Sequence, residues 1–171
     1  MDTSQLVEVL QQSAVEHLTT FRQLQMQRFG SVGIVTTDFE ALYAYKRGDY
    51  QWCLQLSTLN VRTLLYTVRM PGVLAFLAFI QLMDDDFASL TALTLIVNPR
   101  RRQCVFQLTL SLYLMTQCQL KLHHSVRSLA QTLDYIELAQ RRHQVDVTLD
   151  HLTLKLTERQ ILIYLSKIMQ W

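Results

Sequence analysis

Apolar positions along this chain recur at spacings of three and four residues, which is the period of an α-helix. Residues 3–29 show the pattern most simply, because an apolar stripe lies opposite a glutamine-rich face. The same period returns in the segments 121–142 and 157–171. Further helices are expected over 37–47, 49–69, 71–83, 87–97 and 103–119, of which 49–69 is apolar on more than one face and 73–83 has a single polar residue, Gln81. Breaks between the segments are short, as is usual between helices that pack in pairs. The pattern therefore predicts an all-α fold.

Two details refine this prediction. Thr37 with Glu40, and Thr157 with Gln160, stand at the spacing of a capping box, so we expect helices to begin at both places. Residues 145–156 depart from the rule, since apolar and polar residues alternate there. Alternation is typical of short strands, although the same segment also satisfies a helical spacing. Strand and helix both stay open, and we lean to a short extended segment at 145–156.

A tight turn is expected around Gly48 and Asp49. Glycine adopts the left-handed conformation that ends a helix without a Cβ penalty, and Asp49 can cap the helix that follows. Lys46 and Arg47 fall in the last turn of the preceding helix, where the helix dipole favours positive charge. These residues predict an antiparallel helical hairpin.

Gly48-Asp49-Tyr50, with the small residue Cys53 three positions after the tyrosine, resembles the central turn of a tetratricopeptide repeat. The resemblance is best over residues 39–57, and Glu40 departs from it because a large apolar residue is usual there. It implies a right-handed stack of about three antiparallel helical hairpins, with the first and last helices covering the two ends. The length of 171 residues suits a single domain of this kind over residues 1–171, either alone or as one part of a longer protein.

Composition adds limits to this picture. Half of the 171 residues are apolar, with only four Gly and two Pro, which suits one helical domain with a substantial core. The longest apolar run, 73–80, is too short to span a membrane. Cys53, Cys104 and Cys118 are odd in number and lie in apolar surroundings, so we expect reduced core thiols in an intracellular protein, cytoplasmic or nuclear.

No catalytic or metal-binding pattern stands out. Asp84–Asp86 could hold a hard metal ion, but the run reads better as a cap between two helices. His123 and His124 are adjacent and match no zinc spacing with Cys118. We therefore expect no enzyme activity, no cofactor and no metal.

The leading hypothesis is a non-catalytic protein–protein interaction module, an adaptor or a subunit of a larger assembly. By the geometry of the family that the chain resembles, a groove between hairpins would bind a peptide or helix of the partner, and a second copy of the chain could also bind. The candidate groove residues are Asp38, Leu42, Tyr45, Lys46, Phe76, Phe79, Leu82 and Met83. Alternatively, the ends of the chain fold back and fill the groove.

The alternative function is binding of a nucleic acid or an acidic ligand through a basic patch. Two arginine clusters would come together if the hairpin over 103–142 is antiparallel. They are Arg100, Arg101 and Arg102, and Arg141 and Arg142. The formal net charge of only +2 argues against nucleic acid as the main partner.

Overall fold

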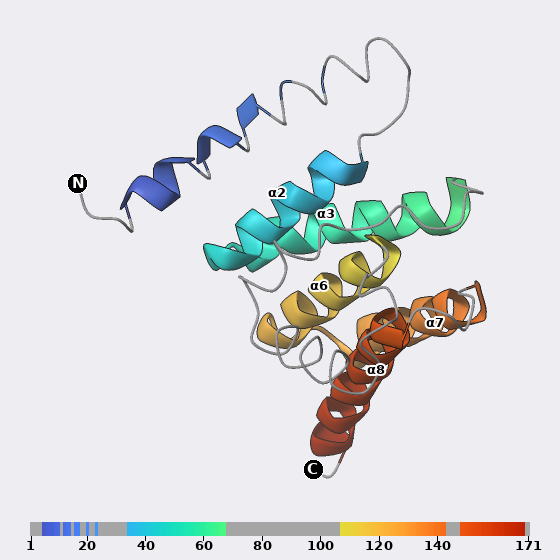
Figure 1. Ribbon diagram of the computed structural model, residues 1–171. Helices are drawn as coiled ribbons and strands as arrows, with labels where there is room; N and C mark the ends of the chain where they lie inside the picture. Colours follow the sequence, from blue (N-terminus) through green and yellow to red (C-terminus); the bar gives the residue numbers. More distant parts are fainter. Residues whose placement is uncertain are drawn as a thin grey trace.

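The structure is a computed structural model that describes residues 5–10, 12–14, 16, 17, 20, 23, 34–67, 107–142 and 148–169 (Figure 1). These residues are almost entirely helical, and no strand occurs among them. The main elements are α2 (Ile34–Lys46), α3 (Tyr50–Arg62), the π-helical turn η1 (Thr63–Thr67), α6 (Gln107–Lys121), α7 (Val126–Arg142) and α8 (Thr148–Met169). The all-α prediction is confirmed for this part of the chain.

Helix α6 is the centre of the described fold. It packs against α2, α3, α7 and α8, and Figure 1 shows it between the α2–α3 pair and the α7–α8 pair. Nearly every residue from Gln107 to Gln119 is buried, the polar ones included. A helix covered on all sides gains most of its stability from tertiary packing, because it has no face left for solvent.

The turn from α2 to α3 forms as its sequence predicts. Gly48 has φ +79°, its N–H donates to the carbonyl of Tyr45, and the N–H of Asp49 donates to the carbonyl of Ala44. These two bonds define a Schellman motif. The Asp49 carboxylate then accepts from the backbone N–H of Trp52 at 3.1 Å, which caps α3.

The turn from α6 to α7 has the same design. His123 has φ +53°, its N–H donates to the carbonyl of Leu120, and the N–H of His124 donates to that of Gln119. Ser125 caps α7 by accepting from the N–H of Ser128 at 3.3 Å. The α6–α7 pair is therefore a second helical hairpin within the described residues.

Two expected helix starts are wrong. Helix α2 spans Ile34–Lys46, so Thr37 lies inside the helix, fully buried, and not at its start. Thr157 lies in the middle of α8, where its hydroxyl donates to the carbonyl of Thr153. In both cases the helix already includes the residues before the expected start, so the capping-box spacing alone does not mark where the helix begins.

The extended segment expected at 145–156 is also wrong wherever the structure describes it, since α8 already begins at Thr148. Leu149, Thr153 and Thr157 are buried at intervals of four residues, which is a helical face. Thr153 tolerates burial because its hydroxyl donates to the carbonyl of Leu149 at 2.8 Å. Residues 145–147 lie outside the described residues, as does the hairpin expected over 71–97.

At the N-terminus, the described residues between 5 and 23 are helical, as expected for 3–29. Gln12 joins this helix to α2: its side-chain oxygen accepts from the hydroxyl of Tyr43 at 2.7 Å and from Arg47 at 3.3 Å. Within the described part of the chain, no helix combines the length and the hydropathy needed to cross a membrane.

Candidate functional site

The described half of the expected groove lies mostly inside the fold. Asp38 and Leu42 are buried, Tyr45 is half-buried and packs edge-on against Tyr50, and only Lys46 is exposed. Helix α6 covers Asp38, because the hydroxyl of Ser111 donates to it. The other groove candidates, Phe76, Phe79, Leu82 and Met83, lie outside the described residues, so the groove itself stays a prediction.

Asp38 instead belongs to a buried polar cluster that joins three helices. Its Oδ1 accepts from Asn60 Nδ2 of α3 at 2.6 Å and from Ser111 Oγ of α6 at 2.8 Å. Its Oδ2 has no hydrogen-bond partner, and neither has Oδ1 of Asn60. Burial raises the pKa of the Asp38 carboxyl from 3.8 to about 7, although the hydrogen bonds from Ser111 and Asn60 act in the opposite direction.

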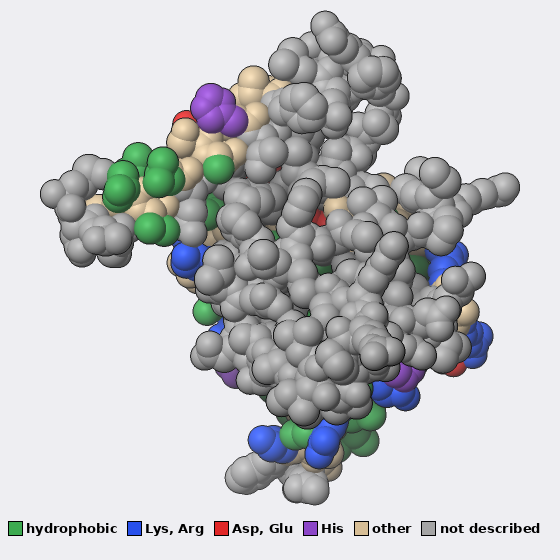
Figure 2. Space-filling view, viewed as in Figure 1, with side chains coloured by type: hydrophobic (Ala, Val, Ile, Leu, Met, Phe, Trp, Pro, Cys, Tyr) green, Lys and Arg blue, Asp and Glu red, His purple; other side chains and the backbone are tan. Residues whose placement is uncertain are grey.

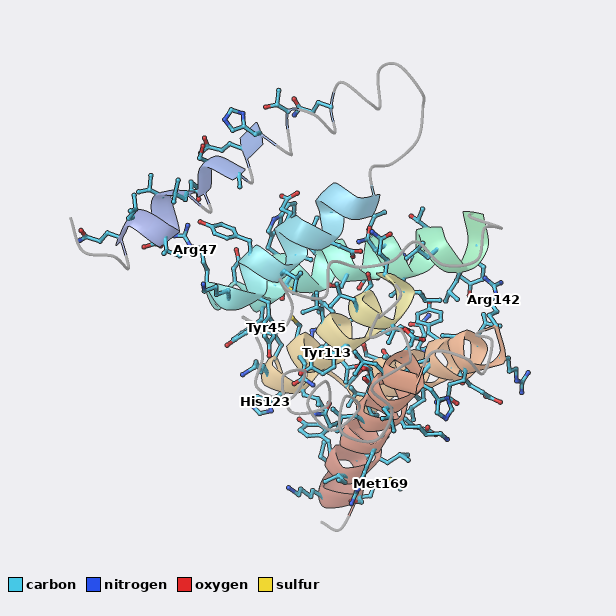
Figure 3. All side chains as sticks on the ribbon, in the orientation of Figure 1. Tyr45, Arg47, Tyr113, His123, Arg142 and Met169 are labelled. Carbon is cyan, nitrogen blue, oxygen red and sulfur yellow. The ribbon has the colours of Figure 1, made fainter. Side chains whose placement is uncertain are left out.

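The basic patch is only partly visible. Arg141 and Arg142 are exposed at the end of α7, and Arg141 forms an ion pair with Glu137 one turn earlier. Figure 3 shows Arg142 at the opposite end of the molecule from Tyr45 and His123. Arg100, Arg101 and Arg102 lie outside the described residues, so the meeting of the two clusters stays a prediction.

His123, Cys53 and Cys118 make their contacts within the fold. His123 stacks on Tyr164 of α8, with its Nδ1 3.1 Å from the tyrosine hydroxyl. Cys53 and Cys118 are free and buried, as expected, while Cys104 is not described. A hydrogen bond with Cys53, together with burial, raises the pKa of the Cys118 thiol, which disfavours the reactive thiolate. Among the described residues no three metal-ligating side chains cluster.

An exposed apolar stripe at the end of α8 was missed by the sequence reasoning. Leu162 is 51% exposed and Met169 is 77% exposed, and a spacing of seven residues puts both on one face of the helix. Ile163 beside them is 44% exposed. We call these three residues the α8 stripe. Figure 2 shows apolar and basic side chains side by side at this end of the molecule, and Figure 3 shows Met169 at the tip of the helix.

The α8 stripe did have a sequence signal. Ile161 and Leu165, the expected core positions, are buried and half-buried, so they account for one face of the helix. Leu162, Ile163, Ile168 and Met169 are further apolar residues of this segment, and each of them is at least 42% exposed, so no second covered face holds them.

No protein-family model matches the chain, and comparisons with curated proteins and with solved structures also found no match.

Proposed function

We propose that this chain is a non-catalytic protein–protein interaction module, an adaptor or a subunit of a larger assembly. The observation that carries the proposal is the α8 stripe. Leu162 and Met169 share one helix face, and Ile163 lies beside it. Leaving such large apolar side chains in water costs free energy, and a partner that covers them recovers it. A helix end that reaches beyond its neighbours is well placed for such a contact (Figure 1).

A stack of helical hairpins like that of tetratricopeptide proteins is part of this proposal. It is supported by two described hairpins with the same turn design, at Gly48 and at His123. Stacked hairpins form elongated surfaces, and such surfaces serve mainly to bind other proteins. The proposal for function rests on the α8 stripe and not on this architecture, since a fold alone does not define a function.

The partner that the stripe fits is an amphipathic helix or peptide of another protein. A stripe of two helical turns matches the apolar face of one short helix. Exposed Arg159 and Lys167 lie along the same helix, so acidic residues at the edge of the partner's apolar face would be complementary.

The test removes the stripe and preserves the helix. In the double variant Leu162→Gln with Met169→Gln, both apolar groups are replaced by a neutral residue of high helix propensity. Val126→Gln is the matched control, because Val126 is a comparably exposed apolar residue (45%) on α7. Each tagged chain is used to capture partners from extracts of its native cells, with quantification by mass spectrometry. Thermal melts establish that all three chains are equally folded.

We expect at least one protein to be recovered equally by the unmodified chain and by the Val126→Gln chain, and at least tenfold less by the double variant. Self-association, followed by sedimentation, identifies the case in which the partner is a second copy. Equal recovery of every captured protein by all three chains would contradict the proposal.

A further inference from the structure

The buried cluster of Asp38, Asn60 and Ser111 contains more hydrogen-bond acceptors than donors. Asp38 Oδ1 already accepts two hydrogen bonds, while Asp38 Oδ2 and Asn60 Oδ1 are both buried acceptors without a partner. Buried polar atoms in folded proteins nearly always have a partner, so two orphaned oxygens on two side chains that are already hydrogen-bonded require an explanation.

One added proton shared between the two orphaned oxygens would give both of them a partner. We propose that Asp38 is protonated in the folded chain and that its Oδ2 hydroxyl donates to Asn60 Oδ1, so that a carboxylic acid–amide pair forms a proton-dependent lock between α2 and α3. The two side chains then exchange two hydrogen bonds, one in each direction. Ser111 donates a third bond, which ties α6 to the lock.

The two alternatives both leave unfavourable contacts. An ionised Asp38 is an acceptor only, so its Oδ2 and Asn60 Oδ1 would both stay unpaired. Exchanging the oxygen and nitrogen of the Asn60 amide would turn Oδ1 of Asn60 toward Asp38 Oδ1, which places two acceptors in contact at 2.6 Å.

No opposite charge among the described residues stabilises an ionised Asp38. Among the described residues, the causes of its pKa shift are burial and the hydrogen bonds of Ser111 and Asn60, and no charged side chain of this part of the chain is among them. The other charged side chains described on α2, α3 and α6 are Glu40, Lys46, Arg62 and Lys121. The remaining titratable side chains on these helices are Tyr43, Tyr45, Tyr50, Tyr113, Cys53 and Cys118. A carboxyl without a compensating charge is favoured in its neutral form.

The lock makes stability depend on pH in a defined direction. The folded chain holds the Asp38 proton up to a pKa of about 7, whereas the unfolded chain releases it near 3.8. This contribution is therefore complete below pH 4, declines as the pH rises toward 7, and is constant above the folded pKa. Loss of the proton loosens the joint of α2 with α3.

The direct test is the carboxyl carbon resonance of Asp38, followed by NMR on the unmodified chain from pH 4 to pH 9. We expect the chemical shift of a protonated acid up to about pH 6 and a midpoint near 7. This measurement needs no variant. A midpoint near the ordinary aspartate value would overturn the proposal.

Asp38→Asn supplies an independent test, because its amide is a permanent neutral analogue of the protonated acid and can donate to Asn60 Oδ1. The melting temperature of the unmodified chain should fall between pH 4 and pH 8 by several degrees more than that of Asp38→Asn. Every other titratable group is the same in the two chains, so the difference between their pH profiles isolates Asp38. Parallel pH profiles for the two chains would contradict the lock.

Discussion

The two described hairpin turns solve one geometric problem with different residues. In each, a residue at positive φ ends the first helix with a pair of Schellman hydrogen bonds, and the next helix is capped from a side chain. The α2–α3 turn uses Gly48, for which this conformation is free of strain. The α6–α7 turn uses His123, which has a Cβ and is strained in this conformation.

The comparison shows which contacts accompany the strained backbone of His123. His123 stacks on Tyr164 and lies within hydrogen-bonding distance of its hydroxyl, so the turn also holds α8. Gly48 has no side chain, and the contacts near its turn come from neighbours instead. Lys121 of the second turn lies over the ring of Tyr50, 5.0 Å from its centroid, so the two turns touch. The Gly48 turn is free of backbone strain, whereas the strained His123 turn also contacts α8 through the His123 side chain.

Gly48→Val should have the largest effect on this comparison. A Cβ at Gly48 would meet no atom within 4 Å, so the cost comes from the positive φ and not from a clash. We expect a loss of about 1–2 kcal/mol in the free energy of unfolding, because β-branched residues resist this conformation. Urea denaturation measures it. An unchanged denaturation midpoint would show that a β-branched residue is tolerated at this positive φ, and the contrast between the glycine turn and the histidine turn would then be wrong.

His123→Gly and His123→Ala sharpen the comparison from the other side. Both remove the ring and its contacts with Tyr164, but only glycine also removes the strain. The glycine variant should therefore be more stable than the alanine variant by about 1 kcal/mol. Denaturation of the two variants side by side gives this difference, and equal stabilities would show that the left-handed strain is not felt at His123.

Lys121→Met should have the smallest effect. The substitution keeps an unbranched side chain beside Tyr50 and removes the charge, so it tests the cation–π contact between the turns. We expect a loss of about 0.5 kcal/mol, which is typical of an exposed contact of this kind. A double-mutant cycle with Tyr50→Leu separates this contact from other effects of the charge. A coupling of zero would leave the two turns independent of each other.

The residues of the α2–α3 turn made it predictable from sequence, whereas those of the α6–α7 turn did so less clearly. Gly48 and Asp49 carry strong individual preferences, whereas nothing in the sequence near His123 requires a left-handed residue there. At 148–156 two periods fitted the same residues, and the choice depended on burial of Leu149 and Thr153 within the packed helices. Information of that kind is tertiary and is absent from a single segment.

The candidate sites were harder still. Asn60 lies 22 residues from Asp38 and Ser111 lies 73 residues from it, so the sequence gives no sign that they meet. The α8 stripe was hidden for a different reason. Periodicity identifies the face of a helix that is buried, and it cannot tell whether a second apolar face, such as that of Leu162 and Met169, is covered by the same chain or left open.

The central place of α6 has a consequence for the order in which the chain folds. During synthesis from the N-terminus, the α2–α3 hairpin is complete long before α6 exists, since Asp38 and Ser111 are 73 residues apart. Before α6 is made, the hydrogen bond from Ser111 to Asp38 is absent, and a hydrated aspartate is ionised at neutral pH. If Asp38 is protonated in the folded chain as proposed above, burial of its carboxyl couples the joining of the early and late parts of the chain to the uptake of a proton.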